Sequence, residues 1–329
     1  MGQVFLLGAG FSKCAGLPLN DELPSLITEA AFRSCQGNTH LKLGPHTSPK
    51  EAAEDSNYYY SLPAIYLTQI ANAREGKSFD RYIACCTEFP SELSGEWKEA
   101  LSNISSLRIR DVVDEAMKEV LEQTPKRTDY IDSLVSYCQR TGSPIYSTNF
   151  DTLIEQACTR MGYEADVAGT FSRGTDLPKA SFRLHKINGS LDWQLGPDVL
   201  DVPLGEYPVR FERSIETMGA QKIALTPSDK LATMATAIPS LLQLHKDFRR
   251  YKKLVSIGSS FQDRHITSAL YPCLFLPGYS MQVVAPSEEL PLNIKQLAES
   301  LKKDWPRRGE VLAVDSYAHM YCNELGEAS

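Results

Sequence analysis

The sequence has no excess of basic charge, no long apolar run and no low-complexity tract. Its 329 residues include 34 Lys and Arg against 41 Asp and Glu, a formal net charge of −7. This balance provides no basic field that would attract a phosphate backbone or an anionic membrane, which disfavours direct binding to nucleic acid or membranes. No stretch approaches the roughly 18 apolar residues of a membrane span. The composition is otherwise that of an ordered globular protein.

The eight cysteines include no CxxC pair, the spacing on which many structural zinc sites depend. Most of them lie in apolar, helix-like segments, which is typical of reduced core residues in a cytosolic protein. The first apolar segment, Gln3 to Leu7, is too short for a signal sequence, and Leu6 stands where a myristoylation signal needs Ser or Thr. We therefore expect a cytoplasmic protein without zinc.

Short apolar strands alternate with helical segments over most of the chain. The first strand, Val4 to Leu7, leads into a glycine turn and then a helix over Asp21 to Arg33. Further strands are predicted at residues 145–148, 182–187, 223–226, 254–258, 281–285 and 311–315, with helices at 152–161, after 263 and at 292–305. This alternation predicts an α/β fold with a doubly wound parallel sheet, in which ligands bind at the carboxyl ends of the strands.

A helical stretch interrupts this alternation. Between Asp111 and Gln123 the apolar residues recur at helical spacing, and a second helix over Tyr130 to Arg140 is followed by Gly142. We predict a helical insertion over residues 46–142, and a principal domain formed by residues 1–45 and 143–329.

The first strand ends in a glycine-rich turn, Gly8-Ala9-Gly10-Phe11-Ser12. Glycines allow backbone amides to approach a pyrophosphate at the start of a helix. The dehydrogenase pattern GxGxxG is not met, because Lys13 occupies the place of the third glycine. The turn is therefore either a phosphate site or a tight connection between strand and helix.

Polar residues also follow three later strands. Asn149 and Asp151 follow the strand at 145–148, and Asp151 is either a site residue or the N-cap of the next helix. A second cluster surrounds His185 and Asn188. Because carboxyl ends of parallel strands meet at one edge, we expect these turns to share a pocket.

The third polar turn follows the strand at 254–258. It contains Gly258, Ser259, Ser260 and Asp263. Small residues of this kind suit a ribose-binding turn, but they also suit a plain turn in which Asp263 caps the following helix.

Taken together, these segments resemble the sirtuin-like family, in the zinc-free branch often found among bacterial antiphage-defence NADases. The matching segments are GAGFSKCAGLP at 8–18, STNFD at 147–151, KINGSLDW at 186–193, LTPSDK at 225–230 and GSSFQDRHI at 258–266. The resemblance covers about residues 1–35 and 143–315 and implies a Rossmann-like fold. Protein deacylation is disfavoured, because deacylases carry CxxC pairs and a Phe-Arg after the proline where this chain has Leu19-Asn20.

The resemblance also implies a role for each candidate residue. Gly8–Ser12 would contact the pyrophosphate of NAD, and Gly258–Ser260 would hold the adenosine ribose. Asn149 would face the nicotinamide ribose, Asp151 would bind the nicotinamide amide, and Asp263 would support the adenosine side.

One residue departs from the family pattern. The family has histidine at the place of Asn188, and asparagine cannot accept a proton near neutral pH. His185 lies three residues earlier, and an odd separation along a strand turns a side chain to the opposite face. His185 is therefore either a replacement base or a packed histidine.

Two functions remain open. In the first, the protein is an NAD hydrolase that releases nicotinamide and ADP-ribose as a defence effector, with Asn149, His185 and Asn188 as catalytic candidates, in a homo-oligomer or beside a partner defence protein. In the second, it is a catalytically impaired sensor or scaffold module that binds NAD or ADP-ribose. The resemblance favours hydrolysis, whereas Asn188 favours the second function.

Overall fold

The computed structural model describes residues 2–37, 67, 82, 106–122, 124–163, 165–168, 182–191, 194–195, 221–222, 230–261, 263–304 and 309–327. The strand predicted at 223–226 and most of the LTPSDK motif lie outside these residues. The chain divides into two compact units. Unit 1 comprises residues 1–17, 124–221 and 231–329, and unit 2 comprises residues 18–123 and 222–230.

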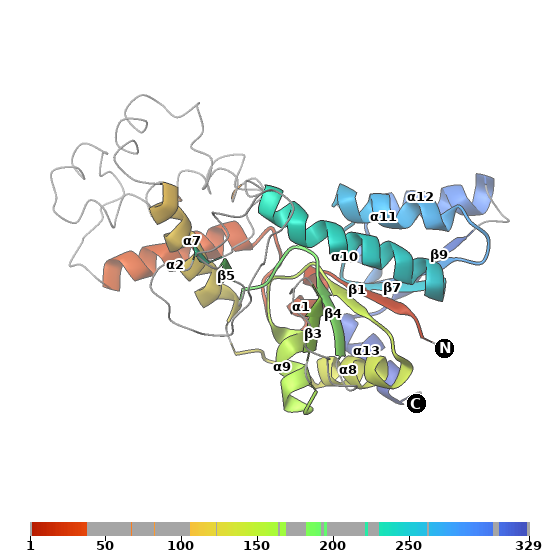
Figure 1. The fold of residues 1–329 in the computed structure, drawn as a ribbon, viewed down its shortest axis with the longest axis horizontal. Helices are drawn as coiled ribbons and strands as arrows, with labels where there is room; N and C mark the ends of the chain where they lie inside the picture. The colour runs from red at the N-terminus through yellow and green to blue at the C-terminus, as the bar shows by residue number, and fades with distance from the viewer. Residues whose placement is uncertain are drawn as a thin grey trace, which may run out of the picture. The chain divides into compact units, whose positions relative to one another are not determined.

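Unit 1 contains a seven-stranded sheet in the order β3-β4-β2-β1-β7-β8-β9 (Figure 1). Its strands are β1 (Val4–Leu7), β2 (Ile145–Ser147), β3 (Ala165–Ala168), β4 (Phe182–Lys186), β7 (Lys253–Ile257), β8 (Ser280–Ala285) and β9 (Glu310–Asp315). Every neighbouring pair is parallel, which confirms the predicted sheet. Two short strands, β5 (Gln194–Leu195) and β6 (Gln221–Lys222), lie outside this sheet.

The direction of the strand order reverses at β1. From β1 the chain builds β2, β3 and β4 on one side, and β7, β8 and β9 on the other. The last residue of β1, Leu7, is in register with Ser147 of β2 and Ile257 of β7, so the carboxyl ends of these three strands are level. Doubly wound sheets bind their ligands outside the strand ends at such a reversal.

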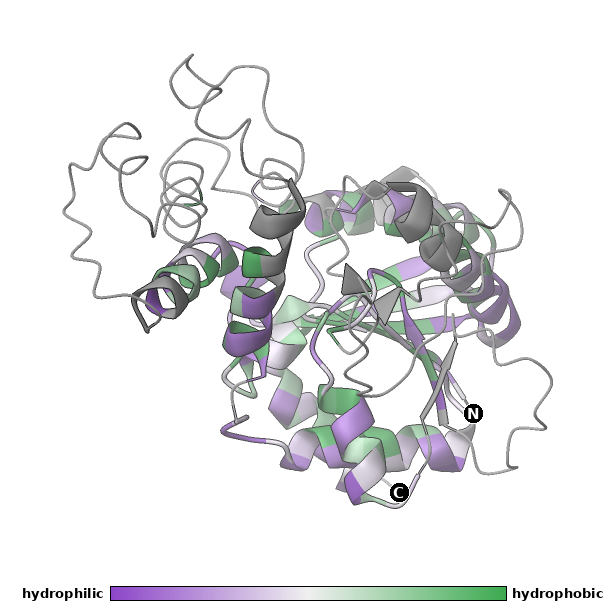
Figure 2. Ribbon diagram, turned by 60° about the vertical axis from the view of Figure 1, so that its left-hand side comes forward, coloured by the Kyte–Doolittle hydropathy of each residue, from purple (hydrophilic) through white to green (hydrophobic). Residues whose placement is uncertain are grey.

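Alternate residues of β1 enter two apolar clusters on opposite faces of the sheet. Phe5 and Leu7 pack with α8 (Asp129–Thr141), α9 (Leu153–Arg160) and α13 (Ala318–Glu327). Val4 and Leu6 pack with α10 (Lys230–Tyr251), α11 (Arg264–Leu274) and α12 (Leu292–Asp304). Helices thus cover both faces, as the doubly wound prediction requires, and hydrophilic and hydrophobic residues alternate along them (Figure 2).

Helix α8 packs against the sheet of unit 1. Its buried residues recur at helical spacing and are Tyr130, Ile131, Leu134, Val135 and Cys138. The helix ends at Gly142, whose φ of 66° is left-handed, so the predicted helix and its stop signal are confirmed. The domain boundaries expected from the sequence remain a prediction, and in the division found here α8 lies in unit 1.

Unit 2 contains α2 (Leu23–Gly37) and α7 (Ser106–Leu121), which pack against each other. Arg33 Nη2 lies 2.9 Å from Glu119 Oε1 across this contact. Thr28 Oγ1 lies 3.0 Å from the hydroxyl of buried Tyr82.

In the part of the chain that the structure describes, no helix combines the length and apolar character needed to cross a membrane.

Candidate functional site at the carboxyl edge of the sheet

The glycine turn after β1 is in direct backbone contact with the turn after β7. The Gly8 amide donates to the Ile257 carbonyl at 3.0 Å, and the Gly10 amide donates to the Gly258 carbonyl at 2.9 Å. A Cβ on Gly258, whose φ is +66°, would lie 2.2 Å from the Phe11 backbone nitrogen. Only glycine fits there. The two turns are therefore locked together.

This contact uses backbone amides that, by the family resemblance, would contact a pyrophosphate. The Phe11 amide donates to the Gly8 carbonyl at 2.9 Å, so the amides of Gly8, Gly10 and Phe11 all have protein partners. Ala9 is the first residue of the short helix α1 (Ala9–Lys13), where the amide has no partner within the helix. Part of the predicted phosphate turn therefore serves to position the loop.

The turn after β2 joins the same cluster through side chains. Asn149 Nδ2 donates to the Gly8 carbonyl at 2.9 Å and to Ser12 Oγ at 2.8 Å. Ser12 Oγ donates to Asp151 Oδ2 at 2.6 Å. All three side chains are buried. The structure thus brings four of the predicted site residues, Gly8, Ser12, Asn149 and Asp151, into one hydrogen-bonded cluster, here called the Asn149–Ser12–Asp151 chain.

The donors and acceptors of this chain have a defined direction. The Gly8 carbonyl can only accept, so the amide nitrogen of Asn149 must face it. Both hydrogens of Asn149 Nδ2 are then used, as is the hydroxyl hydrogen of Ser12. The Asn149 side-chain oxygen accepts no hydrogen bond among the described residues. A ligand would therefore meet an acceptor at Asn149.

Asp151 was expected to be either a site residue or the N-cap of α9, and the structure places it one residue before the N-cap. Its Oδ1 accepts from the Leu153 amide at 3.2 Å, close to the start of α9, while Oδ2 accepts from Ser12. The N-cap position itself is Thr152, whose side chain makes no capping bond. Asp151 therefore supports the helix start with one oxygen and the candidate site with the other.

The turn after β4 lies along the turn after β2. The Ile187 amide donates to the Ser147 carbonyl at 2.8 Å, and the Leu191 amide donates to the Phe150 carbonyl at 3.0 Å. Half-buried Asn188 donates through Nδ2 to the Thr148 carbonyl at 3.2 Å. Asn188 thus stands beside the strand end that carries Asn149, and its role in a site stays a prediction.

His185 lies on the other face of the sheet. Its ring stacks on Tyr146 with centroids 4.4 Å apart and planes inclined by 11°. Tyr146 donates to Asp247 Oδ2 of α10 at 2.7 Å. Burial lowers the pKa of His185 to about 4; Asp247 acts to raise it and Arg183 to lower it further. His185 is therefore neutral at pH 7 and packs on the α10 side, whereas its neighbour Lys186 faces α9.

Lys186 is a site-proximal residue that the sequence patterns did not single out. Its ammonium group is fully buried, donates to the Asp151 carbonyl and lies 3.5 Å from Glu155 Oε1 of α9. Two features of the sequence could have indicated this pair: a lysine in the strand between His185 and Ile187, and a glutamate that follows Leu153 and Ile154 at the start of α9. Charged residues this deep are uncommon unless they are paired.

The four residues predicted as site residues in the turn after β7 differ in their contacts. Gly258 contacts the glycine turn as described, but Ser259 Oγ accepts only a long bond, 3.4 Å, from the Phe261 amide. Ser260 is exposed. Asp263 is the N-cap of α11 and accepts from the His265 amide at 2.8 Å. The capping role of Asp263 is thus realised, and its ligand role stays a prediction.

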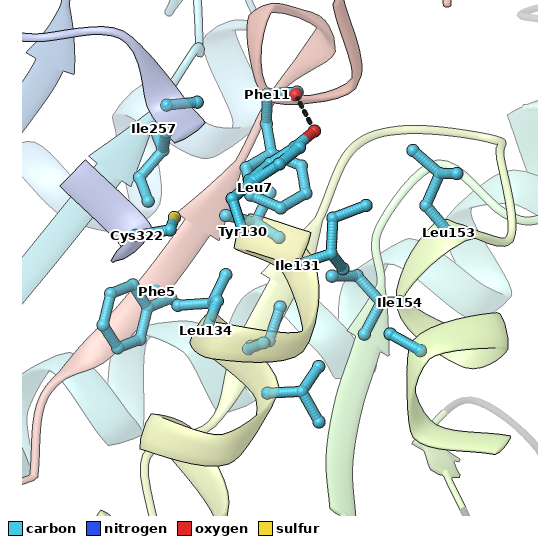
Figure 3. Close-up of a cluster of buried hydrophobic side chains, with 14 of the residues drawn as sticks. Phe5, Leu7, Phe11, Tyr130, Ile131, Leu134, Leu153, Ile154, Ile257 and Cys322 are labelled. Atoms are coloured by element: carbon cyan, nitrogen blue, oxygen red, sulfur yellow. Dashed lines mark hydrogen bonds between the residues drawn. The ribbon is translucent and has the colours of Figure 1, made fainter. Parts of the chain in front are cut away.

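Tyr130 supports the glycine turn from the α8 side. Its hydroxyl donates to the Phe11 carbonyl at 2.7 Å, and the two rings meet edge to face with centroids 5.1 Å apart (Figure 3). Burial raises the pKa of Tyr130 far above its ordinary value, so the hydroxyl remains a donor at every physiological pH.

Across the described ranges, no group of three or more His, Cys, Asp or Glu residues is placed to hold a metal ion.

The reversed strand order and the glycine turn at the reversal define an α/β protein with a Rossmann-like fold. The family model of the SIR2-like domain matches residues 143–303. This match confirms the predicted sirtuin-like resemblance over that stretch, while the antiphage branch stays a prediction. No curated protein is detectably similar in sequence to this chain.

Solved structures similar to this chain include a Sir2 homologue in complex with NAD, at 13% identity and a TM-score of 0.40, covering 99% of this chain and 88% of that chain. A phenylalanine-to-alanine variant of a Sir2 homologue with ADP-ribose gives 13% identity and a TM-score of 0.44, with coverages of 98% and 90%. A histidine-to-asparagine variant with ADP-ribose gives 14% identity and a TM-score of 0.41, with coverages of 99% and 90%.

Proposed function

We propose that this protein binds NAD at the carboxyl edge of its sheet and hydrolyses it to nicotinamide and ADP-ribose. The Asn149–Ser12–Asp151 chain is the observation that carries this proposal, because it fixes an acceptor and a carboxylate beside the glycine turn. The SIR2-like match over residues 143–303 supports the same ligand class. The role we assign is that of a defence effector, acting as a homo-oligomer or with a partner defence protein.

Cleavage of NAD needs no strong proton donor. Nicotinamide leaves a cationic ring as a neutral molecule, so bond cleavage needs the ribose to be positioned and the developing oxocarbenium to be stabilised. Asn149 Oδ1 accepts from a ribose hydroxyl. The carboxylates of Asp151 and Glu155 and the ammonium group of Lys186 together carry a net charge of −1 beside the site. This charge favours a cationic ring and a cationic transition state.

A second function has its own support. Asn188 occupies the place of the family histidine, and His185 packs against Tyr146 on the other face of the sheet. The described residues of the site therefore include no histidine that could act as a general base. A module that binds NAD or ADP-ribose as a sensor or scaffold, with little or no turnover, agrees with this arrangement.

Chromatography of NAD incubated with the purified protein separates the two functions. Hydrolysis predicts release of nicotinamide and ADP-ribose by the wild type and loss of this release in Asn149→Ala. Asn323→Ala is the matched control, because the side-chain oxygen of this asparagine of α13 accepts from Ser133 Oγ at 3.4 Å, outside the site. Calorimetric binding of NAD without product release would establish the sensor function. Absence of both binding and release, in every oligomeric state, would overturn the proposal.

A further inference from the structure

A buried ion pair lies directly behind the candidate site. Lys186 and Glu155 have side chains that are 2% and 5% exposed, and 3.5 Å separates Lys186 Nζ from Glu155 Oε1. Removing two charges from water is costly, and such a pair is often no more stabilising than apolar residues of similar volume. Stability alone therefore gives little reason for a lysine in this strand.

The ammonium group of Lys186 has a second partner that points to a role. It donates to the backbone carbonyl of Asp151, the residue whose carboxylate receives the Ser12 hydroxyl. The connection runs from Glu155 through Lys186 and Asp151 to Ser12 and Asn149. It joins α9 and the ends of β4, β2 and β1, the strands on which the candidate site is built.

We infer that Lys186 is a positioning residue: it holds the Asp151 carbonyl, with Glu155 as its counter-ion, and thereby fixes the Asp151 carboxylate against Ser12. Charge-assisted hydrogen bonds are shorter and stronger than neutral ones, which suits a group that must define a loop conformation. This inference rests on the proposed function for its consequence, namely that Lys186 acts on the nicotinamide end of the ligand through Asp151 without contacting the ligand itself.

The full-length chain and three variants test the inference. Lys186→Met keeps most of the aliphatic stem but leaves the Glu155 carboxylate buried without this cation, so we expect strong destabilisation. The double variant Lys186→Met with Glu155→Gln removes both charges and should recover much of the lost thermal stability. Tyr146→Phe is the matched control, because it deletes one buried hydrogen bond from the opposite face of β2.

Two measurements, both well below the melting temperature of the double variant, distinguish positioning from simple core pairing. The first is amide hydrogen exchange of residues 147–153 without ligand. The second is the ratio of NAD affinity to ADP-ribose affinity. We expect exchange to be about ten-fold faster and the ratio to fall about ten-fold in the double variant, despite its recovered stability. In Tyr146→Phe both should stay within about two-fold of wild type.

Recovery of exchange protection and of the affinity ratio together with stability would overturn the inference, since Lys186 would then be only half of a core ion pair. Unchanged exchange in the double variant would overturn it as well. If the wild type binds neither nucleotide, the proposed function fails, and hydrogen exchange alone still decides whether Lys186 positions the loop.

Discussion

Ser12 Oγ donates a 2.6 Å hydrogen bond to Asp151 Oδ2 across a separation of 139 residues. The bond joins the turn after β1 to the turn after β2, and both partners are buried. Since Ser12 also accepts from Asn149, one hydroxyl orients both an amide and a carboxylate. The geometry of the candidate site depends on this hydroxyl.

Ser12→Ala tests that dependence. The change leaves Asp151 Oδ2 and one hydrogen of Asn149 without partners in a buried place, which costs about 1–3 kcal/mol of unfolding free energy. We also expect NAD affinity to fall about ten-fold, because the acceptor and the carboxylate are no longer fixed. Urea denaturation and calorimetry measure the two effects. Ser133→Ala on α8 is the control: its half-buried hydroxyl donates to the Asp129 carbonyl at 3.1 Å and lies 3.4 Å from Asn323 Oδ1, away from the site, so NAD affinity should stay unchanged.

Gly258→Ala tests the contact between the two glycine turns. A residue with a side chain at a φ of +66° carries a strain of about 1–2 kcal/mol. The added Cβ would also lie 2.2 Å from the Phe11 nitrogen. Relieving this clash by a backbone shift costs about 1–3 kcal/mol more. Because the obstacle is backbone, we expect the turn to shift and ligand affinity to fall.

Gly142→Ala is the control that separates the steric clash of the added Cβ at Gly258 from the strain of its positive φ. Gly142 has the same φ, +66°, but its added Cβ would meet nothing within 4 Å. We therefore expect this variant to lose only the strain contribution and to bind NAD as the wild type does. Equal destabilisation of the two alanine variants in thermal denaturation would contradict the close packing of the turns.

Much of the fold could be predicted from sequence because its signals are local. Apolar runs marked β1, β2 and β7, and Gly142 marked the end of α8. Helix α10 was not assigned, because it contains Pro239 and its apolar residues are not confined to one clear face. The four residues of β3, Ala165–Ala168, are too few and too weakly apolar to stand out.

The candidate site could be predicted in part for a similar reason. Parallel strands place their carboxyl ends together, so the meeting of Ser12, Asn149 and Asp151 followed from topology. The pairing of Lys186 with Glu155 did not, because sequence patterns treat a charged residue as exposed, and only packing of α9 against β4 decides otherwise. The use of the Gly8 and Gly10 amides within the protein likewise depends on a contact with a distant turn.

His185 gives the protein a defined response to acid. Its pKa in the folded protein, about 4, lies below the value of 6.5 for an unperturbed histidine. The unfolded chain therefore binds more protons between these pH values, so this contribution to stability is complete above about pH 6.5 and is lost progressively toward pH 4. The loss amounts to about 3 kcal/mol. The groups coupled to the ring are Asp247, which favours protonation, and Arg183, which opposes it.

Replacing the histidine should remove that response. We expect His185→Phe, which preserves an aromatic ring against Tyr146, to show a flatter dependence of unfolding free energy on pH between 6.5 and 4. Urea denaturation at several pH values measures the slope. His265→Gln replaces an exposed histidine of α11 and should leave the slope of the wild type unchanged. A wild-type slope in His185→Phe would show that other groups cause the acid sensitivity.

The variant Asn188→His tests whether the lack of a general base limits the turnover of NAD. Asn188 donates to the Thr148 carbonyl at 3.2 Å, next to the strand end that carries Asn149, so an imidazole there would enter the same edge of the sheet. A general base contributes about 10²- to 10⁴-fold to such reactions, so nicotinamide release should rise by up to that factor. The gain should follow the titration of the new imidazole, disappearing below its pKa. Asn188→Gln, which adds length without basicity, should not increase release. A rise in both variants would point to a change in loop packing, whereas no rise in Asn188→His would mean that Asn188 is not what limits catalysis.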